Sequence, residues 1–321
     1  MNLHQGGAIP WIVAGGINMD ILAKPACAFR PGDSNPGSIM ERPGGVGYNI
    51  ARNLACFGSQ VLFLTALGGD SAGTALVRHA EERGLDLSSA LIKESHATSR
   101  YLAVHDGEGD IVVAINDMNI FEIMAADEVA PWIKLDSREL CRGAVLDPNL
   151  PAPVLESLAE AFTVRLYADA VSIAKIDRLS GVLPRLYGLK VNRLEAEHLT
   201  GISIEKIEDA ALAANKLCER GIRYVCVSLG TDGALFADGS ALVLGRPAGI
   251  VHDGNATGAG DAMAAAFAWA ANDEAFSLED IARYGVAAAT LAVESDEAVN
   301  PALSYDLLLR HSEKVKIEVI K

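Results

Sequence analysis

Seven residues, N-A-T-G-A-G-D at 255–261, are the part of the chain best suited to chemistry. Small residues lead into Asp261, and the apolar run 262–271 predicts a buried helix that begins there. Backbone N–H groups at a helix start have no intrahelical acceptor and attract anions. The segment therefore predicts phosphoryl transfer, with Asp261 as the general base for an acceptor hydroxyl. A tight turn with Asp261 as helix N-cap is the alternative. The amides of the anion hole would come from Gly258, Ala259 and Gly260.

A second motif, G-G-V-G-Y-N-I-A at 44–51, lies far upstream and runs on to Gly58 and Gly68. Together the two segments resemble the paired signatures of the ribokinase-like (PfkB) carbohydrate and nucleoside kinases. The likeness extends from Ile12 to about Val299 and departs from the usual pattern at Ala256, where many members have Thr or Ser. The resemblance implies an enzyme that uses ATP with Mg²⁺ to phosphorylate a hydroxyl group.

Substrate residues are carried over from the same resemblance. Asn18-Met19-Asp20 follows the first expected strand, at the edge where open α/β sheets bind ligands. A carboxylate there can accept hydrogen bonds from two adjacent sugar hydroxyls, although Asp20 could also simply cap a turn. The resemblance implies that four residues bind the sugar, namely Asp20, Gly44, Gly45 and Asn49. Asn18 is a further candidate for substrate binding, because it lies two positions before Asp20.

Two further segments suggest a nucleotide site. Asn192 and Glu195 have the spacing that places an amide and a carboxylate on one helical turn, where they could organise the waters of Mg²⁺ near a triphosphate. A capping box is the alternative for this pair. Ser228, Gly230 and Gly233 resemble the nucleotide loop of the family, and a plain hairpin entry is the alternative.

Many relatives hold a monovalent cation near the anion hole through an Asp where this chain has Asn255. The missing negative charge leads us to expect weak or no dependence on K⁺.

The acceptor is expected to be a nucleoside. The segments S-N-P-G at 34–37 and V-S-I-A-K at 171–175 resemble the branch of the family that phosphorylates pseudouridine on its 5′-hydroxyl. A base needs additional polar groups, and a site that pairs them rejects sugars that leave them empty. Another nucleoside, a free sugar such as ribose, or a non-catalytic sensor remain alternatives. The candidate base contacts are Asn35, Thr98, Asn116 and Lys175.

Composition restricts the class of partner and compartment. The net charge of -15 argues against nucleic acid as a partner, but a locally positive site could still bind small anions. Five scattered cysteines without metal-ligand spacing indicate reduced thiols and a cytoplasmic protein. Apolar runs are too short to span a membrane.

The order of elements predicts a single domain over 1–321 with a three-layer α/β/α fold around a mainly parallel sheet. Segments 21–43 and 98–117 interrupt the alternation and are expected to form a small β-sheet lid, with ordinary surface excursions as the alternative. The resemblance makes a homodimer through this lid plausible. Expected strands are 11–14, 61–66, 144–147, 165–168, 188–191 and 223–228, and expected helices are 49–57, 74–83, 208–220 and one from 278.

Overall fold

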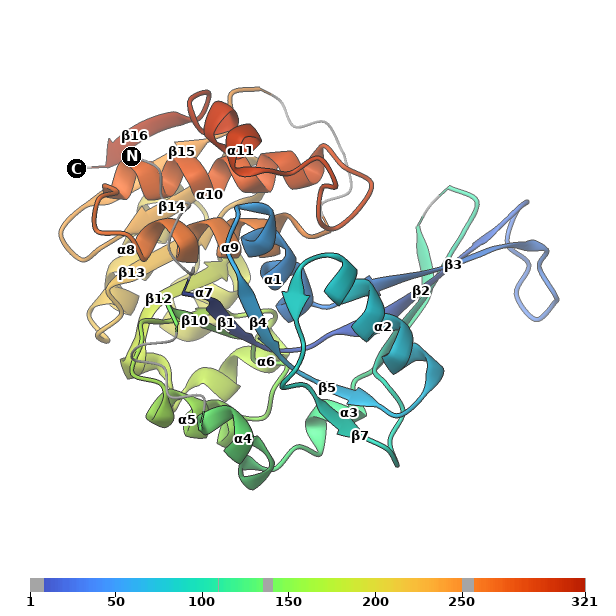
Figure 1. Cartoon of the computed structure of the whole chain (residues 1–321). Coiled ribbons are helices and arrows are strands. Elements are labelled where there is room, and N and C mark those ends of the chain that lie inside the picture. The colour runs from blue at the N-terminus through green and yellow to red at the C-terminus, as the bar shows by residue number, and fades with distance from the viewer. Residues whose placement is uncertain (1–8, 109, 135–140, 250–256, 321) are drawn as a thin grey trace.

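The computed structural model describes residues 9–108, 110–134, 141–249 and 257–320. Within these ranges a central sheet of ten strands crosses the molecule in the order β16-β15-β14-β13-β12-β11-β10-β1-β4-β6 (Figure 1). The strands are β1 (Trp11–Ala14), β4 (Val61–Leu64), β6 (Leu85–Asp86), β10 (Ala144–Leu146), β11 (Leu166–Asp169), β12 (Leu186–Asn192), β13 (Tyr224–Ser228), β14 (Ala234–Ala237), β15 (Leu242–Arg246) and β16 (Lys316–Ile320).

The pairing is parallel from β6 to β13 and antiparallel from β13 to β16. The mainly parallel sheet is thus confirmed, and the antiparallel edge is an addition to what the sequence indicated. Gly233 turns the chain between β13 and β14 at φ 94, where a Cβ would lie 2.0 Å from the Gly245 carbonyl oxygen. Glycine is required at this turn because an L side chain would meet backbone there.

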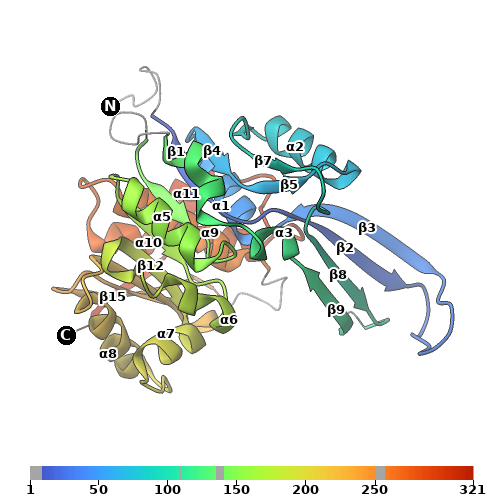
Figure 2. The same ribbon diagram turned by 90° about the horizontal axis from the view of Figure 1, so that it is seen from below.

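Helices cover both faces of the sheet (Figures 1 and 2). Successive strand residues point to opposite faces. Trp11 and Val13 therefore belong to the hydrophobic cluster that includes residues of α1, α2, α9, α10 and α11, whereas Ile12 and Ala14 belong to the cluster that includes residues of α3 to α8. The helices are α1 (Val46–Cys56), α2 (Ser71–Glu82), α3 (Asn119–Glu122), α4 (Ala130–Ile133), α5 (Ala152–Ala161), α6 (Ile173–Ile176), α7 (Arg193–Thr200), α8 (Ile207–Cys218), α9 (Ala259–Ala271), α10 (Leu278–Val293) and α11 (Tyr305–Ser312), with 3₁₀ turns η1 (Ala126–Val129), η2 (Asp177–Leu179), η3 (Leu183–Arg185) and η4 (Gly230–Asp232).

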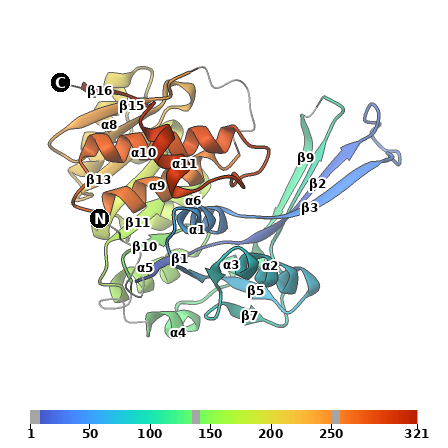
Figure 3. The same cartoon turned by 45° about the horizontal axis from the view of Figure 1, so that its top comes forward.

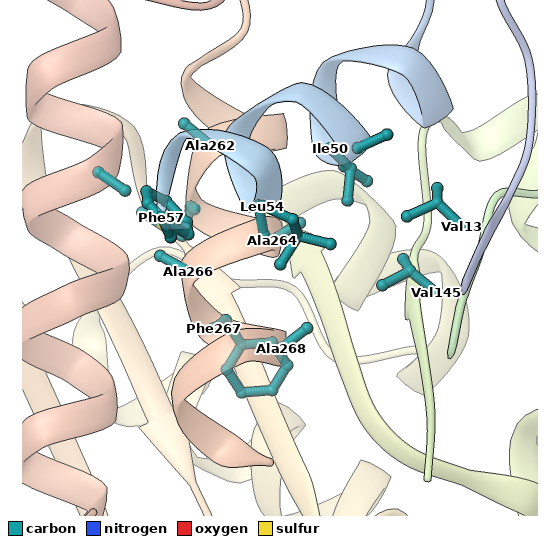
Figure 4. Packing of buried hydrophobic residues seen from close by; sticks show 14 of the residues in the cluster. Val13, Ile50, Leu54, Phe57, Val145, Ala262, Ala264, Ala266, Phe267 and Ala268 are labelled. Atoms are coloured by element: carbon teal, nitrogen blue, oxygen red, sulfur yellow. The ribbon is translucent and has the colours of Figure 1, made fainter. Parts of the chain in front are cut away.

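Helix α9 lies at the centre of one helical layer, between α1 and α10 (Figure 4). Its alanines from Ala262 onward are buried, as expected for a helix that is apolar all round. Small side chains such as Ala264 let α9 lie close to Leu54 of α1 and to the sheet. This packing fixes the position of the residue at the start of α9, which is Asp261 on the first turn.

A four-stranded sheet in the order β3-β2-β8-β9 projects from the body (Figure 3). Its strands largely coincide with the two segments that interrupt the alternation of strands and helices, and β8 and β9 form an antiparallel hairpin. A further pair, β5 and β7, lies beside α2. The bounds are β2 (Asn18–Pro25), β3 (Gly37–Gly44), β5 (Ala66–Gly68), β7 (Leu91–Lys93), β8 (Arg100–His105) and β9 (Ile111–Asp117).

Helix ends follow local signals in the sequence. Ser277 caps α10 through a capping box with Asp280. Gly84 and Gly221 follow α2 and α8 at positive φ. The first helix begins at Val46, three residues earlier than expected, because the glycine motif itself forms the helix start. Within the ranges that the structure describes, no helix is both long enough and apolar enough to cross a membrane.

Candidate active site

A cavity of about 570 Å³ lies between the small sheet and the carboxyl ends of the central strands. Three parts of the fold that are distant in sequence contribute to the cavity wall, namely the small sheet, the start of α1 and the start of α9. This is the usual place for a ligand in an open parallel sheet. The volume falls in the range of small-molecule sites. The cavity is lined by Asn18, Asp20, Leu22, Arg42, Gly45, Val46, Asn49, Tyr101, Ala103, His105, Ile111, Asn116, Met118, Asn149, Val171, Thr257, Asp261 and Ala298.

Asp261 joins the two motifs of the sequence. Its Oδ2 accepts a hydrogen bond of 2.8 Å from the Asn49 side-chain amide. Burial among protein atoms and the nearby charge of Asp169 raise the pKa of Asp261 to about 7, against the hydrogen bond from Asn49 and the charge of Lys190. The carboxylate keeps partial exposure toward the cavity. A base with a pKa near 7 is suited to accept a proton from a bound hydroxyl.

The three residues before Asp261 form the start of α9. Gly258 is the N-cap with φ 85, and its Cβ would lie 2.0 Å from the Ala298 carbonyl oxygen, so only glycine fits. The first intrahelical bond runs from Ala262 N–H to the Gly258 carbonyl over 2.9 Å. The amides of Ala259 and Gly260 therefore precede the helical ladder and can face an anion. Asn255 and Ala256 lie outside the described residues. The expectation of weak or no dependence on K⁺, which rests on Asn255, therefore stays a prediction.

Asp20 lies on β2 and faces the cavity. The Asn18 side-chain amide donates a hydrogen bond to its Oδ1, and the Arg42 Nε lies 3.9 Å from its Oδ2. Burial raises the pKa of Asp20, and Arg42 and Asn18 oppose that shift. A Cβ at Gly44 would lie 2.4 Å from Asp20 Oδ2, and one at Gly45 would lie 2.7 Å from the Gly16 carbonyl oxygen. The glycine pair thus leaves the carboxylate room beside the backbone.

The four candidate base contacts are not all brought together. Asn116 lines the cavity on β9, opposite Tyr101 of β8. Asn35 instead holds its own exposed loop through bonds with Arg30 and Asp33, Thr98 donates to Asp70 over 2.5 Å, and Lys175 pairs with Glu122 over 2.5 Å. These three residues lie outside the cavity wall, and their role as base contacts stays a prediction.

Asn192 and Glu195 form a capping box at the start of α7. Glu195 N–H donates to Asn192 Oδ1 over 2.9 Å, and Asn192 N–H donates to Glu195 Oε2 over 2.7 Å. Burial raises the pKa of Glu195, while Lys190 lowers it. The donors are hard oxygen atoms, which suit Mg²⁺. Because one Glu195 oxygen is engaged in the cap, a contact through water fits better than direct ligation.

The glycine-rich turn after β13 lies next to Asn192. Ser228 is the partner of Asn192 in the β12–β13 register, and the Ser228 hydroxyl donates to the Val191 carbonyl over 3.4 Å. Gly230 has φ 66 and no atom near its would-be Cβ, so the surface beside it is open. Gly233 is fixed by the turn into β14. The antiparallel pairing of β13 and β14 shows that the turn is also a hairpin entry.

Three buried charged residues near Asp261 were not predicted as site residues. Asp147 Oδ2 accepts from the amides of Gly16 and Gly47 over 2.8 and 3.0 Å, which ties β1 to the start of α1. Asp169 and Lys190 form a buried ion pair with 2.9 Å between Oδ2 and Nζ. Burial opposes the charge on Lys190, but Asp169 and Glu195 hold its pKa above the ordinary value. The signals in the sequence were an Asp at or directly after the end of an apolar strand, for Asp169 and Asp147, and a charged residue within an apolar strand for Lys190.

Among the described residues no group of three His, Cys, Asp or Glu side chains could hold a metal ion alone. The oxygen atoms of Asn192 and Glu195 can therefore contribute only part of a Mg²⁺ shell, with phosphate oxygens and water supplying the rest.

The fold and the site together define a kinase for small molecules. The model of the pfkB family of carbohydrate kinases matches residues 12–304, and the chain belongs to this family. The pseudouridine kinase of Escherichia coli strain K12 is 34% identical over 91% of this chain and 93% of its own length. The uncharacterized sugar kinase YeiI of the same strain is 33% identical over 92% and 81%.

Solved structures agree on the architecture. A putative sugar kinase from Clostridium perfringens has a TM-score of 0.85 and 28% identity, with 99% of each chain covered. The Arabidopsis thaliana ribokinase complexed with ribose and ATP has a TM-score of 0.80 at 24% identity, over 95% of this chain and 99% of that one. The ribokinase-like fold is thus confirmed, and the chain is a sugar or nucleoside kinase.

Proposed function

We propose that this chain transfers the γ-phosphoryl group of ATP to the 5′-hydroxyl of pseudouridine and forms pseudouridine 5′-phosphate. The observation that carries the proposal is the hydrogen bond between Asn49 and Asp261, which brings the two motifs to one wall of the cavity. The 34% identity to a pseudouridine kinase supports this acceptor over others.

Asp261 is the general base in this mechanism. It takes the proton of the acceptor hydroxyl as that oxygen attacks the γ-phosphorus, and its pKa of about 7 leaves a large share ionised at neutral pH. The amides of Gly258, Ala259 and Gly260 stabilise the charge on the phosphoryl group in transit. The hydroxyl oxygen forms a bond to the γ-phosphorus, the bond from that phosphorus to the β–γ bridging oxygen breaks, and ADP leaves with that oxygen.

The acceptor is held by its ribose. Asp20 accepts hydrogen bonds from adjacent ribose hydroxyls, and Asn49 fixes the sugar beside Asp261. Asn18 orients the Asp20 carboxylate by its own hydrogen bond, while Gly44 and Gly45 let the ring approach the backbone. This arrangement points the 5′-hydroxyl toward the start of α9.

ATP lies over the turn formed by Ser228, Gly230 and Gly233, where the open space beside Gly230 allows contact with the backbone. Asn192 and Glu195 would hold water molecules of a bound Mg²⁺ ion. When bound, the ion neutralises charge on the ATP phosphates. A monovalent cation plays little or no part.

The small sheet acts as a lid that excludes water from the cavity. Its strands β3 and β9 expose large apolar side chains, an unusual concentration for a solvent-facing surface. We propose that two copies of this cytoplasmic enzyme pair through these strands as a homodimer. The exposed residues are Ile39, Met40, Ile111, Val112, Val113 and Ile115.

The test is ADP release with a panel of pseudouridine, uridine, guanosine and ribose at equal concentration. The proposal requires the highest kcat/KM for pseudouridine. A higher kcat/KM for ribose would overturn the assignment of a nucleoside as the acceptor. A higher kcat/KM for uridine or guanosine would show that the acceptor is a nucleoside other than pseudouridine. Absence of ADP release with every acceptor would favour a non-catalytic binding protein.

A further inference from the structure

Val171 has a backbone conformation that its side chain disfavours. It follows β11 with φ 65, and among the described residues it alone has a positive φ without being glycine. A β-branched residue in this region is a strong outlier. The Ser172 N–H donates to the Ala170 carbonyl over 2.7 Å, so Val171 is the central residue of a γ-turn of the rare strained type.

Buried contacts hold this turn in place. Val171 N–H donates to Asp169 Oδ1 over 2.7 Å, and the other oxygen of Asp169 pairs with Lys190. The Ala170 N–H also bonds to the Lys190 carbonyl over 3.1 Å. Both Asp169 and Lys190 are buried. The contacts of Val171 and Ala170 with Asp169 and Lys190 thus hold the backbone of Val171 in its strained conformation.

Packing in the core does not account for a valine at this position. Val171 is half-exposed and belongs to neither hydrophobic cluster, yet it lines the acceptor cavity with Asn149 and Met118. Glycine would relax the backbone and is the usual residue at such a φ. Strain that is kept at the wall of a binding site suggests that the side chain itself serves binding.

We propose that Val171 is a specificity-determining residue whose isopropyl group contacts the base of the nucleoside acceptor. This inference rests on the proposed function, because a free sugar has no base to fill that part of the cavity. The polar wall around Asp20 binds the ribose, and Val171 supplies an apolar surface on the side formed by the ends of β10 and β11.

The test compares Val171→Gly and Val171→Ala with the wild type in two assays. For kcat/KM with pseudouridine, we expect a loss of ~10- to 100-fold in Val171→Gly, the range for an apolar group removed from a pocket, and a smaller loss in Val171→Ala. The kcat/KM for ribose should stay unchanged. The Tm of Val171→Gly should equal or exceed that of the wild type, because the strain is released.

Gly201→Val is the matched control for strain. Gly201 ends α7 at φ 69, has no atom within reach of an added Cβ and lies outside the cavity wall, so valine there should lower the Tm. If Val171→Gly had a lower Tm and an unchanged nucleoside selectivity, the role of Val171 would be overturned, but the proposed function would stand. A wild type that prefers ribose would overturn both the base contact and the proposed function.

Discussion

Asn49 and Asp261 are separated by 212 positions in the sequence and joined by a hydrogen bond of 2.8 Å. Each residue lies on the first turn or two of a helix, α1 and α9, and these helices pack against each other over small side chains. The hydrogen bond therefore depends on the close packing of α9 against α1, which leaves no room for larger side chains between the two helices. It also adjusts the base, since a donated hydrogen bond favours the charged carboxylate and lowers its pKa.

Asp261→Asn should lower kcat by about 10²–10⁴-fold, because the amide cannot take the hydroxyl proton. The KM values for acceptor and ATP should change little. Asp306→Asn is the matched control, since Asp306 is an exposed Asp on the first turn of α11. Steady-state kinetics of both variants decide the matter, and wild-type turnover in Asp261→Asn would contradict the assignment of the base.

The pH dependence of kcat/KM should follow the ionisation of Asp261. Activity is expected to rise with pH around an apparent pKa of about 7, because only the deprotonated carboxylate accepts a proton. Asn49→Ala removes a hydrogen bond that lowers this pKa, so its profile should move to higher pH. A profile that stays in place, or moves to lower pH, would contradict the link between the two residues.

Asp20→Asn should raise the KM of the acceptor by roughly 10-fold or more while the KM of ATP stays unchanged, because hydrogen bonds to a charged group contribute about 1.5–3 kcal/mol. Glu41→Gln is a suitable control on the adjacent strand, since its side chain is exposed and lies outside the cavity wall. Equal effects on acceptor and nucleotide would argue against a role of Asp20 in acceptor binding.

Much of the fold could be predicted because its signals are local. Apolar runs ended by polar residues marked the parallel strands, and the run of alanines after Asp261 marked α9. The antiparallel edge β14–β16 was not predicted. Its first antiparallel pairing, between β13 and β14, follows from a turn at Gly233, whose steric need is visible only against Gly245.

The site was predictable in part for the same reason. Glycine motifs and Asp261 have fixed spacing, so their place at helix starts follows from the sequence. The γ-turn at Val171 depends on Asp169, and Asp169 pairs with Lys190 on the next strand of the chain, β12. Thr98 and Lys175 are polar residues whose partners, Asp70 and Glu122, no spacing rule connects to them.

Gly258→Ala should reduce both stability and turnover. The added Cβ would meet the Ala298 carbonyl oxygen at 2.0 Å, so the start of α9 must move and the anion hole with it. We expect a loss of at least about 1–2 kcal/mol, the cost of a left-handed conformation for alanine alone. Gly84→Ala is the matched control, because Gly84 has φ 83 and no atom near an added Cβ. Its loss of stability measures the cost of the left-handed conformation without the steric clash. Similar Tm values for the two variants would contradict the steric argument.

Asp261 should also make the protein less stable as pH rises. Its pKa is raised from 3.8 in the unfolded chain to about 7 in the fold, so the folded state binds more protons between these values. Stability is then lost progressively as pH rises from about 4 to 7, and the full cost is present above 7. Asp261→Asn removes this cost because the amide carries no charge.

We therefore expect Asp261→Asn to have a higher Tm than the wild type, by an amount that corresponds to about 1–3 kcal/mol at pH 8 and is smaller at pH 5. Asp306→Asn, exposed on α11, should show no such difference between the two pH values. Thermal unfolding of the three proteins at both pH values provides the measurement. A variant that loses activity and gains stability would show that the carboxylate is held at this position for catalysis, whereas a loss of stability at pH 8 would show that Asp261 mainly supports the fold.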